Sequence, residues 1–169
     1  MTQKRIDAGD PVAMLHVGDE YLYGNNGLEK DVARAIELYE RAAELGMKEA
    51  NYKIGCLYVE GKDVKKDTAK AIRHYEASAM CGHAIARHNL GCEEYDAGNF
   101  DIGMQHWKIA AQLGLADSLK VVKISFMNGD TTKADYAAAL RGYQNANDEM
   151  SSTDRDEAKS LGRDKIIEM

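Results

Sequence analysis

Apolar and small residues recur along this chain at the spacing of one helix face. The clearest example is Ala35-Ile36-x-x-Tyr39-x-x-Ala42-Ala43, and related motifs start at Ala71, Gly103 and Ala139. Offsets of three, four and seven residues place these side chains on the same side of a helix, whereas a strand would alternate. The pattern therefore predicts helices along most of the chain.

A second motif precedes each of these, with an alanine and a glycine five positions later. It runs from Ala13 to Gly18, from Ala50 to Gly55 and from Ala86 to Gly91. A weaker fourth copy, 118–126, has a lysine in place of the small residue. The two motifs alternate, with a spacing of 36–37 residues between the first copies. Such a period is typical of stacked helix pairs that bury their apolar faces against their neighbours.

Residues that start and end helices stand between the motifs. Asp10 before Pro11 is an N-cap followed by proline at the first helical position, and Thr132 with Asp135 resembles a capping box. Glycine just after a periodic run ends a helix, because it enters the left-handed conformation at little cost. The other N-caps and the closing glycines are Asp31, Asp67, Gly46, Gly82 and Gly114.

We therefore predict an all-α, right-handed superhelix of four helix-turn-helix repeats and a C-terminal helix. The paired helices are expected at 11–24 and 32–45, 48–60 and 68–81, 84–97 and 100–113, and 116–128 and 133–149. The array would span 10–149, as repeats at about 10–47, 48–83, 84–115 and 116–149. Ser151 and Ser152 predict the start of a capping helix in 150–169. The segment before Asp10 leaves no room for a separate helix, which favours a partner or neighbouring chain there.

Composition narrows the function. The chain has 169 residues, of which 44% are hydrophobic and 30% charged, as in a folded protein with one short array. Its net charge of −6 repels phosphate backbones, so we expect no nucleic-acid partner. No long apolar run or secretory segment is visible, and the three cysteines are too few for a disulfide framework. These features predict a cytoplasmic or nuclear protein with reduced thiols and no membrane association.

The first two repeats share a longer motif. Ala-x-x-x-(Leu/Ile/Val)-Gly-x-x-Tyr-x-x-Gly ends at Gly24 and Gly61, and (Lys/Arg)-Ala-x-x-x-Tyr follows at Arg34 and Lys70. This pattern resembles the Sel-like repeat family, a relative of the tetratricopeptide repeat. The third repeat has only the short turn Gly98-Asn99 between its helices, and the fourth is degenerate. The resemblance implies an α-solenoid that serves as a scaffold for protein complexes.

In tetratricopeptide-type arrays the first helix of each pair lines a concave groove, which assigns candidate partner-binding residues here. They are Leu15, Asp19, Leu22, Tyr23, Tyr52, Cys56, Val59, Glu60, His88, Cys92, Tyr95, Asp96, Lys120 and Met127, with Ile124 and Asn128 beside them. We expect an extended or helical peptide, anchored by Tyr52 and Tyr95 and selected for basic residues by Glu60 and Asp96. The alternative is that these residues pack between helices or against the C-terminal helix.

The leading function is a protein–protein interaction adaptor or scaffold that is not an enzyme and needs no cofactor. The alternatives are a small metal-binding protein or enzyme, and a structural subunit of a larger assembly; the oligomeric state stays open. His88 and Cys92 lie one helical turn apart, yet Cys56 belongs to the preceding repeat, too far for metal–sulfur bonds of about 2.3 Å. We therefore predict no metal site.

Two further groups of residues could have a functional role or a purely structural one. Cys81-Gly82-His83 places a thiol beside an imidazole, but the glycine is explained as a helix stop, and we predict no catalytic residues. The basic stretch from Lys62 to Arg73 would contact acidic partners or form a solvated face. Phosphate-binding glycine loops and the common hydrolase motifs are not found.

Overall fold

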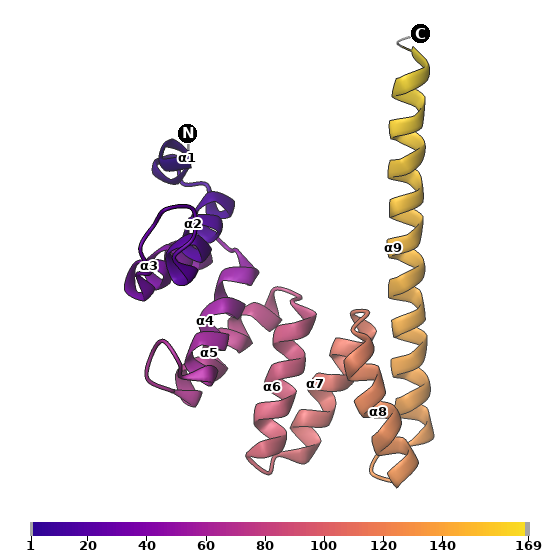
Figure 1. The fold of residues 1–169 in the computed structure, drawn as a ribbon. Helices are drawn as coiled ribbons and strands as arrows, with labels where there is room; N and C mark the ends of the chain where they lie inside the picture. Colours follow the sequence, from indigo (N-terminus) through magenta and orange to yellow (C-terminus); the bar gives the residue numbers. More distant parts are fainter. Residues whose placement is uncertain (1, 168–169) are drawn as a thin grey trace. The chain divides into compact units, whose positions relative to one another are not determined.

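The computed structural model describes the backbone of residues 2–167 and the side chains of residues 4–153. Within this part of the chain there are nine helices and no strand (Figure 1). They are α1 (Thr2–Asp7), α2 (Pro11–Tyr23), α3 (Val32–Glu44), α4 (Lys48–Glu60), α5 (Thr68–Met80), α6 (Ala84–Asp96), α7 (Phe100–Gln112), α8 (Ala116–Asn128) and α9 (Lys133–Ile167). The all-α class and the helix pairs predicted from the sequence are confirmed.

The predicted helix starts have a direct physical cause in the structure. The Asp10 carboxylate accepts hydrogen bonds from the backbone N–H groups of Val12 and Ala13, at 3.0 and 3.2 Å. Asp31 and Asp67 cap α3 and α5 in the same way. At the start of α9, the N–H of Asp135 donates to Thr132 Oγ1 at 3.1 Å. Each side chain satisfies N–H groups that have no partner inside the helix.

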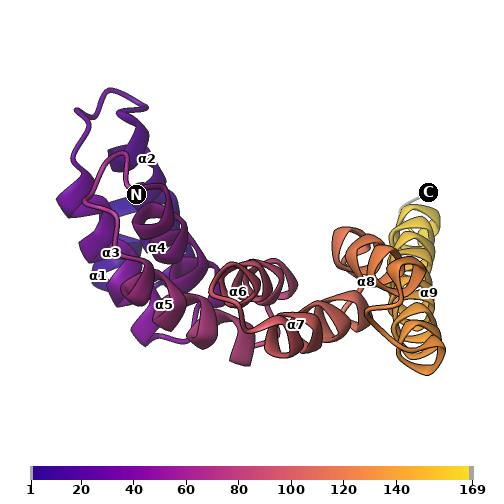
Figure 2. The same cartoon turned by 90° about the horizontal axis from the view of Figure 1, so that it is seen from below.

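The chain divides into two compact units, 1–93 and 94–169. In the first unit, α2 packs against α3, α3 against α4, and α4 against α5 (Figure 2). The loop between α2 and α3 lies beside the loop between α4 and α5, because Lys30 of the first forms an ion pair with Asp63 of the second. The buried centre contains the paired-motif residues, with Tyr39 and Ile54 both 0% exposed. Repeated small and large residues thus produce two clusters of buried residues in this unit, one over α1–α4 and one around Tyr75 and Leu90.

In the second unit, α7 packs against both α8 and α9. Trp107, which occupies the position of Tyr39 and Tyr75 in the motif, is buried together with Ala110 and Ala111. The glycine at position 142 lets α9 approach α7 closely, because a Cβ atom there would lie 2.5 Å from Cγ of Gln112. A small residue therefore allows close packing here too, between α9 of the degenerate fourth pair and α7 of the third pair.

The expectation that no helix fits before Asp10 is wrong, because α1 occupies that segment. Ile6 is its only large apolar residue described, and it is 4% exposed against the core of the first unit. Arg5 fastens α1 to the next helix by donating to the Asp10 carboxylate at 2.8 Å. A single apolar side chain leaves no periodicity in the sequence, so the pattern could not indicate this helix.

The prediction of a separate helix that begins near 152 is also wrong, because α9 continues through that point (Figure 1). Ser151 and Ser152 donate to the carbonyl oxygens of Asn147 and Glu149, at 2.9 and 2.8 Å. Such back-bonding satisfies the hydroxyl within a helix, so serine does not start a new one. A capping role of 154–169 concerns side chains outside the described residues.

Candidate partner-binding surface

The candidate groove residues of the first unit differ in how much surface they offer. Leu22 is 5% exposed and belongs to the buried core, so its assignment to the groove is corrected. Tyr23, the next residue, is 65% exposed. Successive side chains of a helix point in different directions, so in the last turn of α2 Leu22 faces the core while Tyr23 faces solvent. Leu15 and Asp19 are half-buried and line a pocket of about 330 Å³ beside Arg5 and His16.

Asp19 is held in place by two groups of the first unit. Tyr39 donates its hydroxyl to Asp19 Oδ1 at 2.6 Å, and Lys53 Nζ lies 2.8 Å from the same oxygen. Burial and the neighbouring Asp19 carboxylate raise the pKa of the Tyr39 phenol, which stays protonated and keeps donating. Asp19 therefore serves the packing of the first two repeats as well as the pocket.

Tyr52 and Cys56 are half-buried and pack between helices. The Tyr52 ring stacks on His83, with 4.7 Å between ring centroids, and the Tyr75 hydroxyl donates to Cys56 Sγ at 3.5 Å. Burial, with a smaller contribution from Cys56, raises the pKa of Tyr52 to about 12. Val59 packs on the same cluster. For this group, the contacts favour the packing interpretation over a free aromatic anchor.

The other candidates of the first unit lie at or near its surface. Glu60 is exposed, and its carboxylate lies 3.4 Å from Lys62 Nζ. His88 and Cys92, on α6, are half-buried. Among the residues with described side chains, no three histidine, cysteine, aspartate or glutamate residues come together as metal ligands do.

The second unit presents an open pocket of about 400 Å³ beside the candidate Tyr95. Tyr95 is 45% exposed, and its ring meets the edge of Phe100 at 4.8 Å and lies 5.3 Å from Trp107. Phe100 itself is 58% exposed. The residues that line this aromatic pocket are Tyr95, Phe100, Asp101, Met104, Ser125 and Asp130.

Most of the aromatic pocket was not predicted from the sequence, because the candidate list used only first helices of each pair. Phe100, Asp101 and Met104 belong to α7, a second helix. The available indication was Phe100, an aromatic residue at a helix start where the first two repeats have the smaller Val32 and Thr68. The remaining candidates of this unit, Asp96, Lys120, Ile124, Met127 and Asn128, are exposed.

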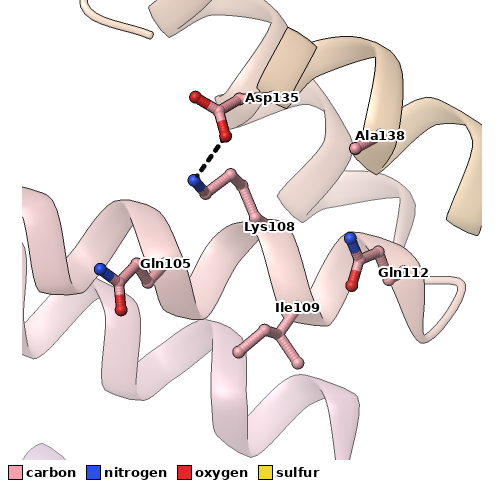
Figure 3. Close-up of a pocket in the computed structure, with 6 residues that line it drawn as sticks. All are labelled: Gln105, Lys108, Ile109, Gln112, Asp135 and Ala138. Atoms are coloured by element: carbon pink, nitrogen blue, oxygen red, sulfur yellow. Dashed lines mark hydrogen bonds and ion pairs between the residues drawn. The ribbon is translucent and has the colours of Figure 1, made fainter. Parts of the chain in front are cut away.

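A second, smaller pocket of about 210 Å³ lies between α7 and the start of α9 (Figure 3). Lys108 extends across it to Asp135, with Nζ 2.9 Å from Oδ1. The hydrogen bond from Lys108, helped by that from Thr132, lowers the pKa of Asp135 to about 2. The two charged groups are thus already paired with each other. Their ion pair links α7 to α9 and leaves little in this pocket for a ligand to bind.

One member of the thiol–imidazole pair, His83, and one of the basic stretch, Lys70, make structural contacts. His83 Nδ1 accepts a hydrogen bond from the N–H of Ala86 at 3.0 Å, so His83 caps α6, while Gly82 has φ +77°. Lys70 Nζ donates to the Tyr58 hydroxyl at 2.7 Å and lies over its ring. Lys65, Lys66 and Arg73 are exposed.

Comparison with known families agrees with this arrangement. The model of the Sel1 repeat family matches residues 11–47, 48–83 and 84–115, more than half of the chain. The chain belongs to the Sel1 repeat family. Three Sel1 repeats with flanking helices therefore account for the tetratricopeptide-like fold, and the resemblance noted in the sequence is confirmed.

Solved structures share this Sel1 fold. The protective antigen c5321 of uropathogenic Escherichia coli is 29% identical with a TM-score of 0.71, over 88% of this chain and 32% of that protein. A Sel1 repeat protein from Oxalobacter formigenes is 29% identical with a TM-score of 0.68, over 90% of this chain and 62% of that one. Cysteine-rich protein B of Helicobacter pylori is 20% identical with a TM-score of 0.57, over 71% of this chain and 93% of that one.

The chain thus spans about one third of the first of these relatives and less than two thirds of the second. A comparison with curated protein sequences finds no match. The Sel1 solenoid is a protein-interaction fold. Among the described residues, no helix combines the length and the apolar character that crossing a bilayer requires, and long α9 is too polar.

Proposed function

We propose that this Sel1 repeat chain is an adaptor that binds a segment of a partner protein and performs no chemistry of its own. The observation that supports this most directly is the aromatic pocket. Tyr95 and Phe100 each expose about half of their surface around a hollow instead of filling the core. Exposed aromatic side chains in a concave site are typical of protein interfaces, where they supply contact area at low entropic cost.

Two other exposed candidates of the second unit would extend the contact beyond the pocket. Met127 of α8 is 73% exposed and Asp96 of α6 is exposed as well. Both are candidates at the ends of first helices, where the repeat architecture places a binding face. An apolar centre with a polar rim is the usual composition of an interface. We therefore propose that the partner segment contacts Tyr95, Met127 and Asp96 together.

A random peptide library displayed on phage and selected on the immobilised full chain would test this proposal. The enriched peptides, made synthetically, should bind the wild-type protein and lose about tenfold in affinity for Phe100→Ser, because removing an interface aromatic costs on the order of 1–2 kcal/mol or more. Ile102→Ser is the matched control, since Ile102 is a 47% exposed residue of the same helix that does not line the pocket.

Two results would contradict the adaptor proposal. One is a selection that enriches no peptide on the folded chain. The other is a set of peptides that bind the Phe100→Ser protein as tightly as they bind wild type and Ile102→Ser. Melting curves of all three proteins establish that the two variants are folded.

A further inference from the structure

We infer that the aromatic pocket takes the side chain of one lysine or arginine of the partner segment. This inference rests on the proposed function and specifies its chemistry. The pocket is formed within the second unit by Tyr95 of α6, by Phe100, Asp101 and Met104 of α7, and by Ser125 and Asp130 at the end of α8. It thus combines apolar walls with two carboxylates and contains no basic residue.

The walls suit a long side chain with a cationic end. Tyr95 and Phe100 meet edge to face at 4.8 Å, so each ring keeps part of its surface open to the pocket. Half-buried Met104 adds a flexible apolar surface next to them. The methylene stem of lysine or arginine packs on such surfaces, and aromatic faces attract its positive charge.

The two carboxylates have no basic partner among the residues with described side chains. Some other aspartates of this chain are held in ion pairs, among them Asp19 with Lys53, Asp63 with Lys30, and Asp135 with Lys108. Asp101 and Asp130 instead line the pocket, and neither takes part in an ion pair of the described residues. Two unpaired negative charges at one apolar hollow favour a cation and disfavour an acidic residue.

Because of these two carboxylates, we expect the pocket to bind a basic side chain more tightly than a purely apolar one. An apolar residue would fill the walls but would partly desolvate both carboxylates without compensation, which costs free energy. A lysine or arginine fills the same walls and pairs with the carboxylates. We expect this difference to favour the basic residue about tenfold, the sum of a cation–π contact and partly screened ion pairs.

Four short peptides of identical sequence, acetyl-alanine-leucine-Xaa-leucine-alanine-amide, would measure this preference. Xaa is arginine, lysine, norleucine or glutamate, and norleucine supplies the length of lysine without its charge. Binding to the full chain is followed by NMR, through the methyl group of Met104 and the ring of Phe100 at the pocket and through the exposed methyl group of Met80 in the first unit. We expect the arginine and lysine peptides to bind about tenfold more tightly than norleucine at 50 mM salt, and this advantage to shrink at 500 mM.

The double variant Asp101→Asn/Asp130→Asn tests the carboxylates while preserving their shape. It should reduce the preference for arginine over norleucine to about twofold or less and leave norleucine binding nearly unchanged. Asp148→Asn/Glu149→Gln, at two exposed carboxylates on α9, makes the same change in net charge and should keep the tenfold preference. Melting curves show that each protein is folded.

Equal binding of norleucine and arginine would overturn the inference, and so would a preference that survives in the double variant. Perturbations confined to residues of the first unit would overturn it too, while peptide binding, and with it the adaptor proposal, would stand. If display-selected peptides bind and none carries a basic residue at the pocket, the inference alone fails. If no peptide of either kind binds, the adaptor proposal fails with it.

Discussion

Gly55 and Tyr75 meet at the contact point between α4 and α5. A Cβ atom added at Gly55 would lie 2.6 Å from Cδ1 of Tyr75, a side chain only 2% exposed. The preceding repeat has the same relationship, since a Cβ atom at Gly18 would lie 2.5 Å from Cε1 of Tyr39. Each of these two repeats therefore uses a glycine on its first helix to admit the tyrosine ring of its second.

We predict that Gly55→Ala destabilises the first unit. Alanine favours a helix over glycine by about 1 kcal/mol, but forcing a methyl group into a closely packed site costs about 1–3 kcal/mol. Since the Tyr75 ring is buried and the added methyl group would press on it, we expect a net loss of up to about 2 kcal/mol. Urea unfolding followed by circular dichroism measures it.

The variant Tyr75→Ala provides the matched background for this prediction. Without the ring, the methyl group of alanine at position 55 no longer clashes with Tyr75, and Gly55→Ala should become neutral or stabilising. If Gly55→Ala costs the same free energy with and without the ring, the contact at Tyr75 is not its cause. The double-mutant cycle isolates the pair because the two residues touch.

This relationship explains why most of the fold could be predicted from the sequence. The contacts are local, between helices that follow each other in the chain, and each requires a small residue opposite a large one. Ala50-x-x-x-x-Gly55 and Ala71-x-x-x-Tyr75 therefore leave a periodic record in the sequence. The capping aspartates act within one turn and are visible for the same reason.

We predict different costs for two tyrosine hydroxyl groups that occupy equivalent positions. Tyr39→Phe removes the 2.6 Å hydrogen bond to Asp19, and hydrogen bonds to charged groups contribute about 1.5–3 kcal/mol. Asp19 keeps Lys53 as a partner, so we expect the low end of this range, about 1.5 kcal/mol. Tyr75→Phe loses only a 3.5 Å contact with Cys56 sulfur, a weak acceptor, and should cost about 0.5 kcal/mol or less.

Urea unfolding of both variants under identical conditions gives the comparison. Phenylalanine keeps the ring against the glycine in each case, so the difference between the two variants reports the hydroxyl partner. Equal losses, or a larger loss for Tyr75→Phe, would show that Asp19 does not contribute as the structure indicates.

The binding surface was harder to predict because exposure depends on neighbours that are distant in sequence. Leu22 and Tyr23 are adjacent, yet one belongs to the core and the other is mostly exposed. Tyr52 is half-buried because His83, which lies 31 residues later in the turn before α6, stacks on its ring. Periodicity identifies the inner side of a helix but not which positions a neighbouring loop or helix covers. Phe100 was missed because the candidate positions were taken only from the first helix of each pair, and Phe100 begins a second helix.

We predict that the first unit loses stability as the pH falls below about 6.5. Burial lowers the pKa of His83 and of His74 from 6.5, with nearby lysines Lys48 and Lys70 adding to the effect. The unfolded chain then binds more protons than the folded one in this range, so protonation favours unfolding. Stability is fully present above pH 6.5 and is lost as the pH falls through the folded-state pKa values.

Melting temperatures between pH 7.5 and 5 measure this loss. Asp135, with its pKa near 2, loses its contribution only in stronger acid and does not interfere. His83→Asn should flatten the decline, because asparagine also accepts a hydrogen bond at a helix start but does not titrate. His16→Asn, at an exposed histidine of α2, should leave the decline as in wild type. An unchanged slope in a His74→Asn/His83→Asn protein would refute the assignment.

We predict that Thr132 stabilises α9 as its N-cap, whereas Ser151 and Ser152 in the middle of the helix do not act as caps. Thr132→Ala removes the acceptor for the Asp135 N–H and should cost about 0.5–2 kcal/mol, the usual price of a lost N-cap. Ser151→Ala/Ser152→Ala removes hydroxyl groups that only bond back to Asn147 and Glu149 within the helix. Because alanine is the better helix former, the double variant should be neutral or up to about 0.5 kcal/mol more stable.

The ellipticity at 222 nm and the urea midpoint distinguish these outcomes in one set of samples. A continuous α9 retains or gains helical content in the serine variant and loses stability in the threonine variant. A fall in helical content after Ser151→Ala/Ser152→Ala would mean that the serines begin a second helix after all. Serine in mid-helix and serine at a cap have the same sequence context here, so only the direction of this change separates the two roles.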